Sequence, residues 1–203
     1  MRRVVVSAAI GVLALASARP AVAQGSSQPA PWTSYGTSLY ATGPDVWVRF
    51  FGADAGYTSD LLWICDLSSS CSQSLFENND GYLGGEEVEI NHTFSVGDEV
   101  LFRLAVSNTG DNWYSGPAIR NSDGYAHFAT ESYSDVTANA TYSVLGGFED
   151  TYGGGDGDHN DLMFEFGNVA TTPVSVTPEP ATLLLLGTGL LGLGLATVLR
   201  RAA

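Results

Sequence analysis

Short apolar or alternating runs recur along the middle of the chain, and turn-forming sequences such as Asn-Asp-Gly at 79–81 and Ser-Asp-Gly at 122–124 separate them. Runs of this length, bounded by Gly, Asn and Asp, are typical of β-strands. No internal stretch of the sequence repeats its apolar positions with the 3.6-residue period of a helix. The pattern predicts strands at 46–51, 61–67, 88–94, 100–106, 125–128, 142–148 and 162–166.

These strands indicate an all-β protein with a single domain over residues 41–170. Short strands with Gly- and Asn-rich connections favour a β-sandwich or a jelly roll. Residues 24–40 are rich in Gly, Ser, Pro and Tyr, and we expect them to form an exposed, flexible lead-in. Residues 171–177 are expected to be a linker.

The first 23 residues have the pattern of a secretory signal peptide. The chain begins Met-Arg-Arg, continues with an apolar run over 4–16, and reaches Ala-Val-Ala at 21–23. A basic start, a short apolar core and small residues at a cleavage site together direct a chain to export. The mature protein is therefore expected to begin near Gln24 and to meet an oxidising environment.

The last residues form a second apolar segment. Residues 181–199 carry no charge, and as a helix these 19 residues would be about 28 Å long, enough to span a bilayer. Arg200 and Arg201 follow directly. Basic flanks stay on the cytoplasmic side, so the rest of the protein is expected to lie outside the inner membrane.

The triplet Pro178, Glu179 and Pro180, the apolar span and the terminal arginines together resemble the PEP-CTERM sorting tail of Gram-negative bacteria, over residues 178–203. The resemblance implies recognition by an exosortase in the inner membrane and cleavage near the triplet. It also implies delivery to the cell surface or to an exopolysaccharide matrix. A plain C-terminal membrane anchor is the alternative.

The charge of the chain limits its partners. The net charge is −14 and no lysine occurs, and residues 24–177 hold 21 acidic side chains against three arginines, which gives −18. Such a chain repels nucleic acid, and a nucleic-acid-binding function is excluded. It attracts divalent cations.

Cys65 and Cys71 enclose a polar loop of five residues at the end of an apolar run. In an exported protein, two cysteines this close are expected to form a disulfide. Closing so short a ring contributes about 2 kcal/mol in the chain-entropy model. Zinc binding is not expected, because a zinc site takes four ligands and the histidines are far apart in the sequence.

The sequence GFEDTYGGGDGDHNDLMF at 147–164 concentrates five carboxylates and an asparagine around a run of glycines. Carboxylate and carbonyl oxygens are the ligands of Ca²⁺, and glycines allow the backbone to turn tightly around an ion. The sequence fits neither an EF-hand nor a repeated β-roll, because the required Gly, Glu and Asp positions are occupied by other residues. The predicted Ca²⁺ ligands are Asp156, Asp158, Asn160 and Asp161, with Glu149 and Asp150 as a further pair.

Residues 99–167 resemble an uncharacterised domain of secreted bacterial proteins, whose closing signature is similar to GFED, a Gly-rich turn and G-D-x-D-x-N-D before an apolar strand. The acids of that domain have been interpreted as catalytic groups. A glycosidase needs two carboxylates about 5 to 10 Å apart across a sugar cleft, and Glu149 with Asp158 or Asp161 would supply them. A solvated acidic loop that binds no ion is the remaining alternative.

The sequence offers four further candidate side chains. His127 and His159 are expected to be hydrogen-bonding histidines at loops or strand edges, rather than catalytic bases, and His159 is expected to point outward. Trp113 and Tyr114 are candidates for stacking on a sugar ring, with packing over the sandwich edge as the alternative.

Taken together, the sequence predicts a non-enzymatic exported protein of the cell surface or exopolysaccharide matrix, with one Ca²⁺-stabilised β domain. The alternatives are a Ca²⁺-dependent carbohydrate-binding module and a carbohydrate-active hydrolase.

Overall fold

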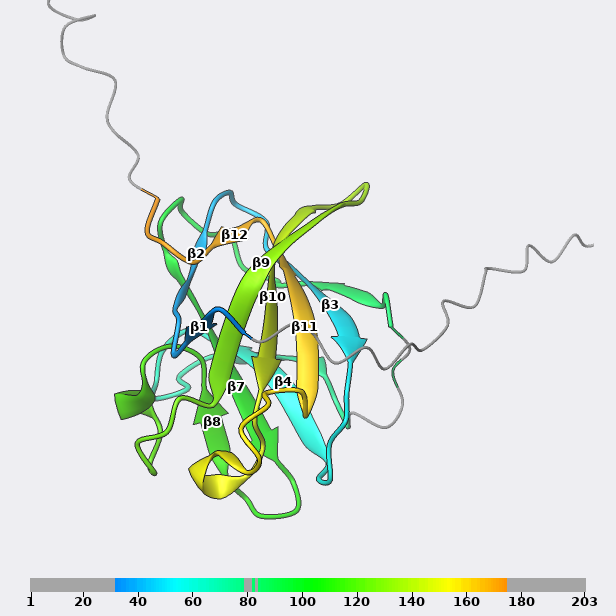
Figure 1. Cartoon of the computed structure of the whole chain (residues 1–203). Helices are drawn as coiled ribbons and strands as arrows, with labels where there is room; N and C mark the ends of the chain where they lie inside the picture. Colours follow the sequence, from blue (N-terminus) through cyan, green and yellow to red (C-terminus); the bar gives the residue numbers. More distant parts are fainter. Residues whose placement is uncertain (1–31, 79–81, 83, 175–203) are drawn as a thin grey trace, which may run out of the picture.

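The computed structural model describes residues 32–78, 82 and 84–174, and in this part of the chain the prediction of an all-β protein is confirmed (Figure 1). The predicted signal peptide at 1–23, the triplet at 178–180 and the apolar span at 181–199 lie outside the described residues. Among the residues that are described, no helix is long and apolar enough to cross a membrane.

Within the described residues, twelve strands form two antiparallel sheets. The first sheet has the order β1-β9-β10-β11-β3-β6. Its strands are β1 (Ser34–Tyr35), β9 (Phe128–Val136), β10 (Thr141–Phe148), β11 (Leu162–Gly167), β3 (Trp47–Gly52) and β6 (Glu87–Glu89).

The second sheet has the order β12-β2-β7-β4-β5, and β8 pairs with β7 beside this path. Its strands are β12 (Val169–Ala170), β2 (Leu39–Ala41), β7 (Glu99–Val106), β4 (Ser59–Ile64), β5 (Ser72–Phe76) and β8 (Asn112–Tyr114). The short 3₁₀ turns η2 (Ala118–Arg120) and η3 (Tyr152–Gly154) lie in connections.

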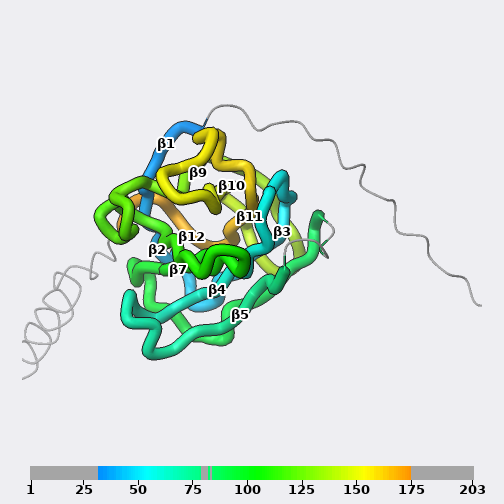
Figure 2. The backbone as a smooth tube through the Cα atoms, turned by 90° about the horizontal axis from the view of Figure 1, so that it is seen from below, coloured from blue at the N-terminus to red at the C-terminus, as the bar shows by residue number. Residues whose placement is uncertain are grey.

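The two sheets pack face to face, as in a β-sandwich (Figure 2). Side chains alternate along β3, where Val48 and Phe50 are buried and Arg49 faces outward. Between the sheets, the rings of Phe102 from β7 and Phe166 from β11 have centroids 4.8 Å apart. Burial of aromatic and aliphatic side chains between the layers supplies the main stabilisation of such a domain.

The outer face of the first sheet is also covered in part. Trp32, which is 7% exposed, packs against Ala129, Leu145 and Met163 of β9, β10 and β11. The expectation of an exposed lead-in is therefore wrong in part for residues 32–40, because Trp32 and Leu39 are buried, although Thr33, Ser34 and Tyr35 are exposed. Residues 32–40 contribute Trp32, β1 and β2, and Leu39 of β2 is completely buried.

The predicted strands correspond to β3, β4, β6, β7, β9, β10 and β11, with shifted ends. The run at 61–67 ends at Ile64, because Cys65 and Cys71 lie at disulfide bonding distance, with sulfurs 2.07 Å apart, and close the β4–β5 turn. The run at 125–128 begins only at Phe128 and continues to Val136. Five strands were not predicted, because β1, β2, β8 and β12 have only two or three residues and β5 is mostly polar.

Candidate functional site

The acidic loop, residues 149–161, connects β10 to β11. Phe148 and Leu162 form the last residue pair of the two strands, and Phe148 is also paired with Phe128 at the start of β9. The segment that precedes β9 therefore lies beside the acidic loop at one end of the sandwich (Figure 1). The amide of Glu149 donates to the carbonyl of His127 at 2.9 Å and continues the pairing into the loop.

Close packing against Tyr125 and Trp32 explains two of the glycines. Gly154 has φ +83°, and a Cβ at this position would lie 2.1 Å from Cζ of Tyr125. At Gly147, a Cβ would lie 2.0 Å from the carbonyl oxygen of His159 and 2.5 Å from the ring of Trp32. Only glycine fits at either position without movement of the neighbouring groups.

Glu149, Asp156 and Asp158 form a carboxylate cluster in which one oxygen of each residue lies within 4.8 Å of the others. Glu149 is 1% exposed, whereas Asp156 is exposed and Asp158 is partly buried. The amide of His159 donates to Oε1 of Glu149 at 2.6 Å. Burial raises the pKa of Glu149, and the charges of Asp156 and Asp158 raise it further, against the effect of that amide.

Asp158 is held from two sides. Its main-chain carbonyl accepts a hydrogen bond from the indole Nε1 of Trp32 at 2.6 Å. Its carboxylate accepts two hydrogen bonds from Asn160, from Nδ2 at 2.6 Å and from the main-chain amide at 3.1 Å. Asn160 therefore orients the carboxylate of Asp158, and its amide group points at that carboxylate.

Asp150 and Asp161 form a separate carboxyl pair. The amide of Asp150 donates to Oδ2 of Asp161 at 2.8 Å. Burial raises the pKa of Asp161 to about 8, with the negative charges of Asp150 and Glu149 as further causes, and burial also raises the pKa of Asp150. The six predicted ligands are therefore divided: three form the cluster, two form the pair, and Asn160 bonds to a cluster member.

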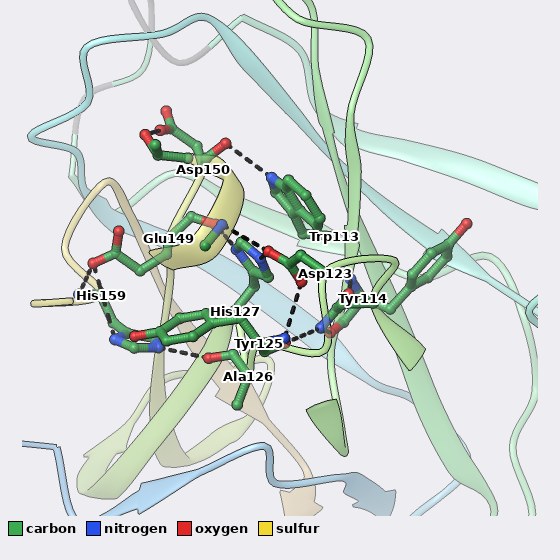
Figure 3. Close-up of polar contacts among 12 residues, drawn as sticks. Trp113, Tyr114, Asp123, Tyr125, Ala126, His127, Glu149, Asp150 and His159 are labelled. Atoms are coloured by element: carbon green, nitrogen blue, oxygen red, sulfur yellow. Dashed lines mark hydrogen bonds and ion pairs between the residues drawn. The ribbon is translucent and has the colours of Figure 1, made fainter. Parts of the chain in front are cut away.

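Asp123 and His127, which were not predicted as site residues, fix the acidic loop from the neighbouring segment (Figure 3). Oδ2 of Asp123 accepts from the amide of Gly153 at 2.8 Å and lies 2.8 Å from Nε2 of His127. Burial acts to raise the pKa of Asp123, but the amides of Tyr125 and Gly153 and the ring of His127 outweigh it, so the pKa is lowered.

Both ring nitrogens of His127 face oxygen acceptors. Nδ1 lies 2.8 Å from the carbonyl of Glu149, which only accepts, and Nε2 faces the ionised carboxylate of Asp123. His127 therefore donates from Nδ1 to the first residue of the acidic loop, and its ring links that residue to Asp123. As predicted, it hydrogen-bonds at a strand edge. The Asn-Ser-Asp-Gly turn at 121–124 and His127 belong to the stretch that resembles the secreted domain, but neither the turn nor the resemblance indicated this contact.

The expectation that His159 points outward is wrong. The side chain is completely buried, and Nε2 donates to the carbonyl of Ala126 at 2.8 Å. Burial lowers the pKa of His159, so the ring is neutral at pH 7. Its ring packs against Tyr125 and against the exposed Tyr35, with centroids 5.8 Å and 5.1 Å away.

Trp113 is not available to a sugar, because it is completely buried. Its indole Nε1 donates to the carbonyl of Asp150 at 2.8 Å, and its ring stacks on His127. Tyr114 is partly buried, and its amide donates to Oδ1 of Asn121 at 2.7 Å. The alternative interpretation of Trp113, packing within the sandwich, is the correct one.

The geometry favours binding of a cation over glycoside hydrolysis. A glycosidase needs both carboxylates in contact with the sugar, but Glu149 is only 1% exposed. Three carboxylate oxygens at short mutual distance instead match the ligand chemistry of a hard divalent ion.

Comparison with known proteins identifies the C-terminal segment. Residues 176–201 match the family model described as the PEP-CTERM protein-sorting motif. The chain therefore carries a PEP-CTERM motif, as its sequence predicted, and this motif is the recognition signal for an exosortase. No curated protein and no solved structure matches the chain. The resemblance of residues 99–167 to the uncharacterised secreted domain stays a prediction.

Proposed function

We propose that this chain is an exported cell-surface or exopolysaccharide-matrix protein, non-enzymatic, whose β domain is stabilised by Ca²⁺ at the acidic loop. The observation that carries the proposal is the carboxylate cluster of Glu149, Asp156 and Asp158. Ca²⁺–oxygen bonds measure about 2.3–2.6 Å, so two oxygens on one ion lie at most about 5 Å apart. The mutual distances within the cluster, up to 4.8 Å, meet this limit.

Electrostatics supports the same proposal. Glu149 is buried beside two other carboxylates, and its pKa is raised because its ionised form is disfavoured there. A dication bound between the three groups would remove their repulsion. Main-chain carbonyls and water would complete a coordination number of six to eight.

Thermal unfolding tests the proposal, with the full-length chain in detergent micelles and near-ultraviolet circular dichroism as the signal. Millimolar Ca²⁺ is expected to raise the midpoint by about 5–10 °C relative to chelator, if the ion is present at about 100 times its Kd. Glu149→Gln should remove the shift. Glu89→Gln is the matched control, because Glu89 is an exposed carboxylate on β6 at the other end of the sheet. An unchanged wild-type midpoint would refute Ca²⁺ binding.

The PEP-CTERM motif supports the proposed route to the cell surface, with transient anchoring in the inner membrane before processing. In a host that contains an exosortase, replacing Pro178, Glu179 and Pro180 by alanine is expected to leave the protein in the membrane fraction. The wild type should reach the surface or the medium. Equal distribution of both proteins would contradict the exosortase as sorting partner.

Ca²⁺-dependent carbohydrate binding is a second candidate, favoured by the exposure of the cluster. Asp156 is exposed, and Tyr35, which packs against His159, is 55% exposed. An ion held at such a surface keeps positions open for sugar hydroxyls, and an exposed ring offers a stacking face. Retention on immobilised exopolysaccharide with Ca²⁺, and release by chelator without new reducing ends, would establish it. Release of reducing ends that is lost in Glu149→Gln would instead establish the hydrolase alternative.

A further inference from the structure

The carboxyl groups of the consecutive residues Glu149 and Asp150 lie on opposite sides of the chain. Side chains alternate along an extended backbone, and the hydrogen bonds follow this alternation. The carboxylate of Glu149 accepts from the amide of His159, whereas Oδ1 of Asp150 accepts from the hydroxyl of Thr151 at 3.2 Å. In Figure 3 the carboxylate of Glu149 lies next to His159, and Asp150 lies apart from it beside Trp113. An ion bound by the carboxylate cluster would therefore not contact the carboxyl group of Asp150.

One carboxylate oxygen of Asp150 is buried without a hydrogen-bond donor among the described residues. The residue is 1% exposed, and its Oδ2 atom accepts no hydrogen bond from any residue that the structure describes. Leaving such an oxygen buried and unpaired is costly, and buried carboxylates are normally paired with a cation or bound to a metal. Burial raises the pKa of Asp150 and outweighs the contacts with Asp161, Thr151 and the amide of Tyr57, which lower it. Asp161, when ionised, adds a second negative charge beside the buried oxygen.

We propose that Asp150 and Asp161 hold a second divalent cation, so that the acidic loop binds two Ca²⁺ ions. This inference rests on the proposed function, because it assumes that the loop binds Ca²⁺ at all. Thr151, whose hydroxyl already contacts Asp150, offers a further oxygen ligand. Asp161 is only partly buried, which gives the ion access from solvent.

The charge of the loop supports two ions rather than one. Residues 149–161 contain five carboxylates and one histidine, His159, which is buried and neutral. One dication leaves most of this negative charge uncompensated, and a second brings the loop close to neutrality. The competing occupant of the Asp150–Asp161 pair is a shared proton, in agreement with the raised pKa values of both acids.

The test is the number of Ca²⁺ ions bound per full-length chain in detergent, measured by equilibrium dialysis and by isothermal titration calorimetry at pH 7.5. The wild type is expected to bind two ions, and Asp156→Asn and Asp161→Asn one ion each. The control Glu89→Gln should still bind two. Circular dichroism verifies that each variant is folded.

The outcomes separate the two proposals. One ion in the wild type, with the same single ion in Asp161→Asn, would overturn the second site and leave a shared proton between Asp150 and Asp161. Two ions in both proteins would overturn the assignment to this pair. No bound ion would refute the proposed function itself. If Asp161→Asn does not fold, the number of ions bound by the wild-type chain still decides between one ion and two. Tb³⁺ luminescence provides an independent count of these ions.

Discussion

The rings of Trp113 and His127 lie face to face, with centroids 3.8 Å apart and planes inclined by 6°. The two stacked rings donate hydrogen bonds to consecutive carbonyls, Trp113 to Asp150 and His127 to Glu149, each at 2.8 Å. The stack fixes the point at which the acidic loop leaves β10, and thereby the positions of the two acids that begin it.

Replacing Trp113 by phenylalanine should destabilise the domain by about 2–4 kcal/mol, because a buried carbonyl loses its donor and a cavity forms. Urea unfolding measures this loss, and Ca²⁺ affinity should fall with it. Trp47→Phe is the control, since Trp47 is only partly buried on β3, and a smaller effect is expected. Equal losses in the two variants would show that the stack has no special role.

Gly154→Ala should lower the free energy of unfolding far more than Gly153→Ala. Both residues have positive φ, +83° and +75°, so alanine costs about 1–2 kcal/mol of backbone strain at either position. At Gly154 the new methyl group would also overlap the ring of Tyr125, whereas nothing lies within 4 Å at Gly153. The difference in unfolding free energy between the two variants reports this overlap. Identical values would mean that Tyr125 moves away freely.

Arg49→Met should destabilise the domain by about 3–5 kcal/mol, because it leaves a buried charge unpaired. The guanidinium bonds to Glu165, which is 3% exposed, and to Asp135 at 2.6 Å, and it lies 4.4 Å from the ring centroid of Tyr142.

Arg120→Met is the matched control, because the pair of Arg120 with Glu99 is more accessible to solvent and should be worth at most about 1 kcal/mol. The double variant Arg49→Met, Glu165→Gln should recover part of the loss, because it also removes the unpaired charge. No recovery in chemical unfolding would contradict this explanation.

In the presence of chelator, stability should fall as the pH rises from about 7 to 9. The folded pKa of Asp161 is about 8, above the unfolded value of 3.8, so the folded protein binds a proton that the unfolded chain has lost. The stabilising effect is present at low pH and disappears as the pH rises through the folded pKa. His159 has a lowered pKa and titrates below this window.

Urea unfolding at a series of pH values measures how steeply the free energy of unfolding falls with pH. Asp161→Asn should make this pH dependence weaker. Saturating Ca²⁺ should also weaken it, by displacing the proton. A flat profile for the wild-type protein in chelator would contradict the assignment of the raised pKa to Asp161.

The sequence by itself determined the all-β class, the main strands, the disulfide and the sorting motif, because each of these depends on residues close together in the chain. The alternation of Val48 and Phe50 with Arg49 requires only neighbouring positions, and so does the short loop between Cys65 and Cys71. The PEP-CTERM motif is likewise contiguous, and its match covers residues 176–201.

Only the tertiary structure decided how the acidic residues are grouped. Glu149 and Asp150 are adjacent in the sequence, yet they join different sets of carboxylates, because their side chains lie on opposite sides of the chain. Trp32 contacts Asp158, which is 126 residues away in the sequence. The two ring nitrogens of His127 form hydrogen bonds with Asp123 and with the carbonyl of Glu149. Such contacts form when the strands pair and the two sheets pack. Local sequence patterns therefore could predict that the loop is acidic, but not which of its acids share a site.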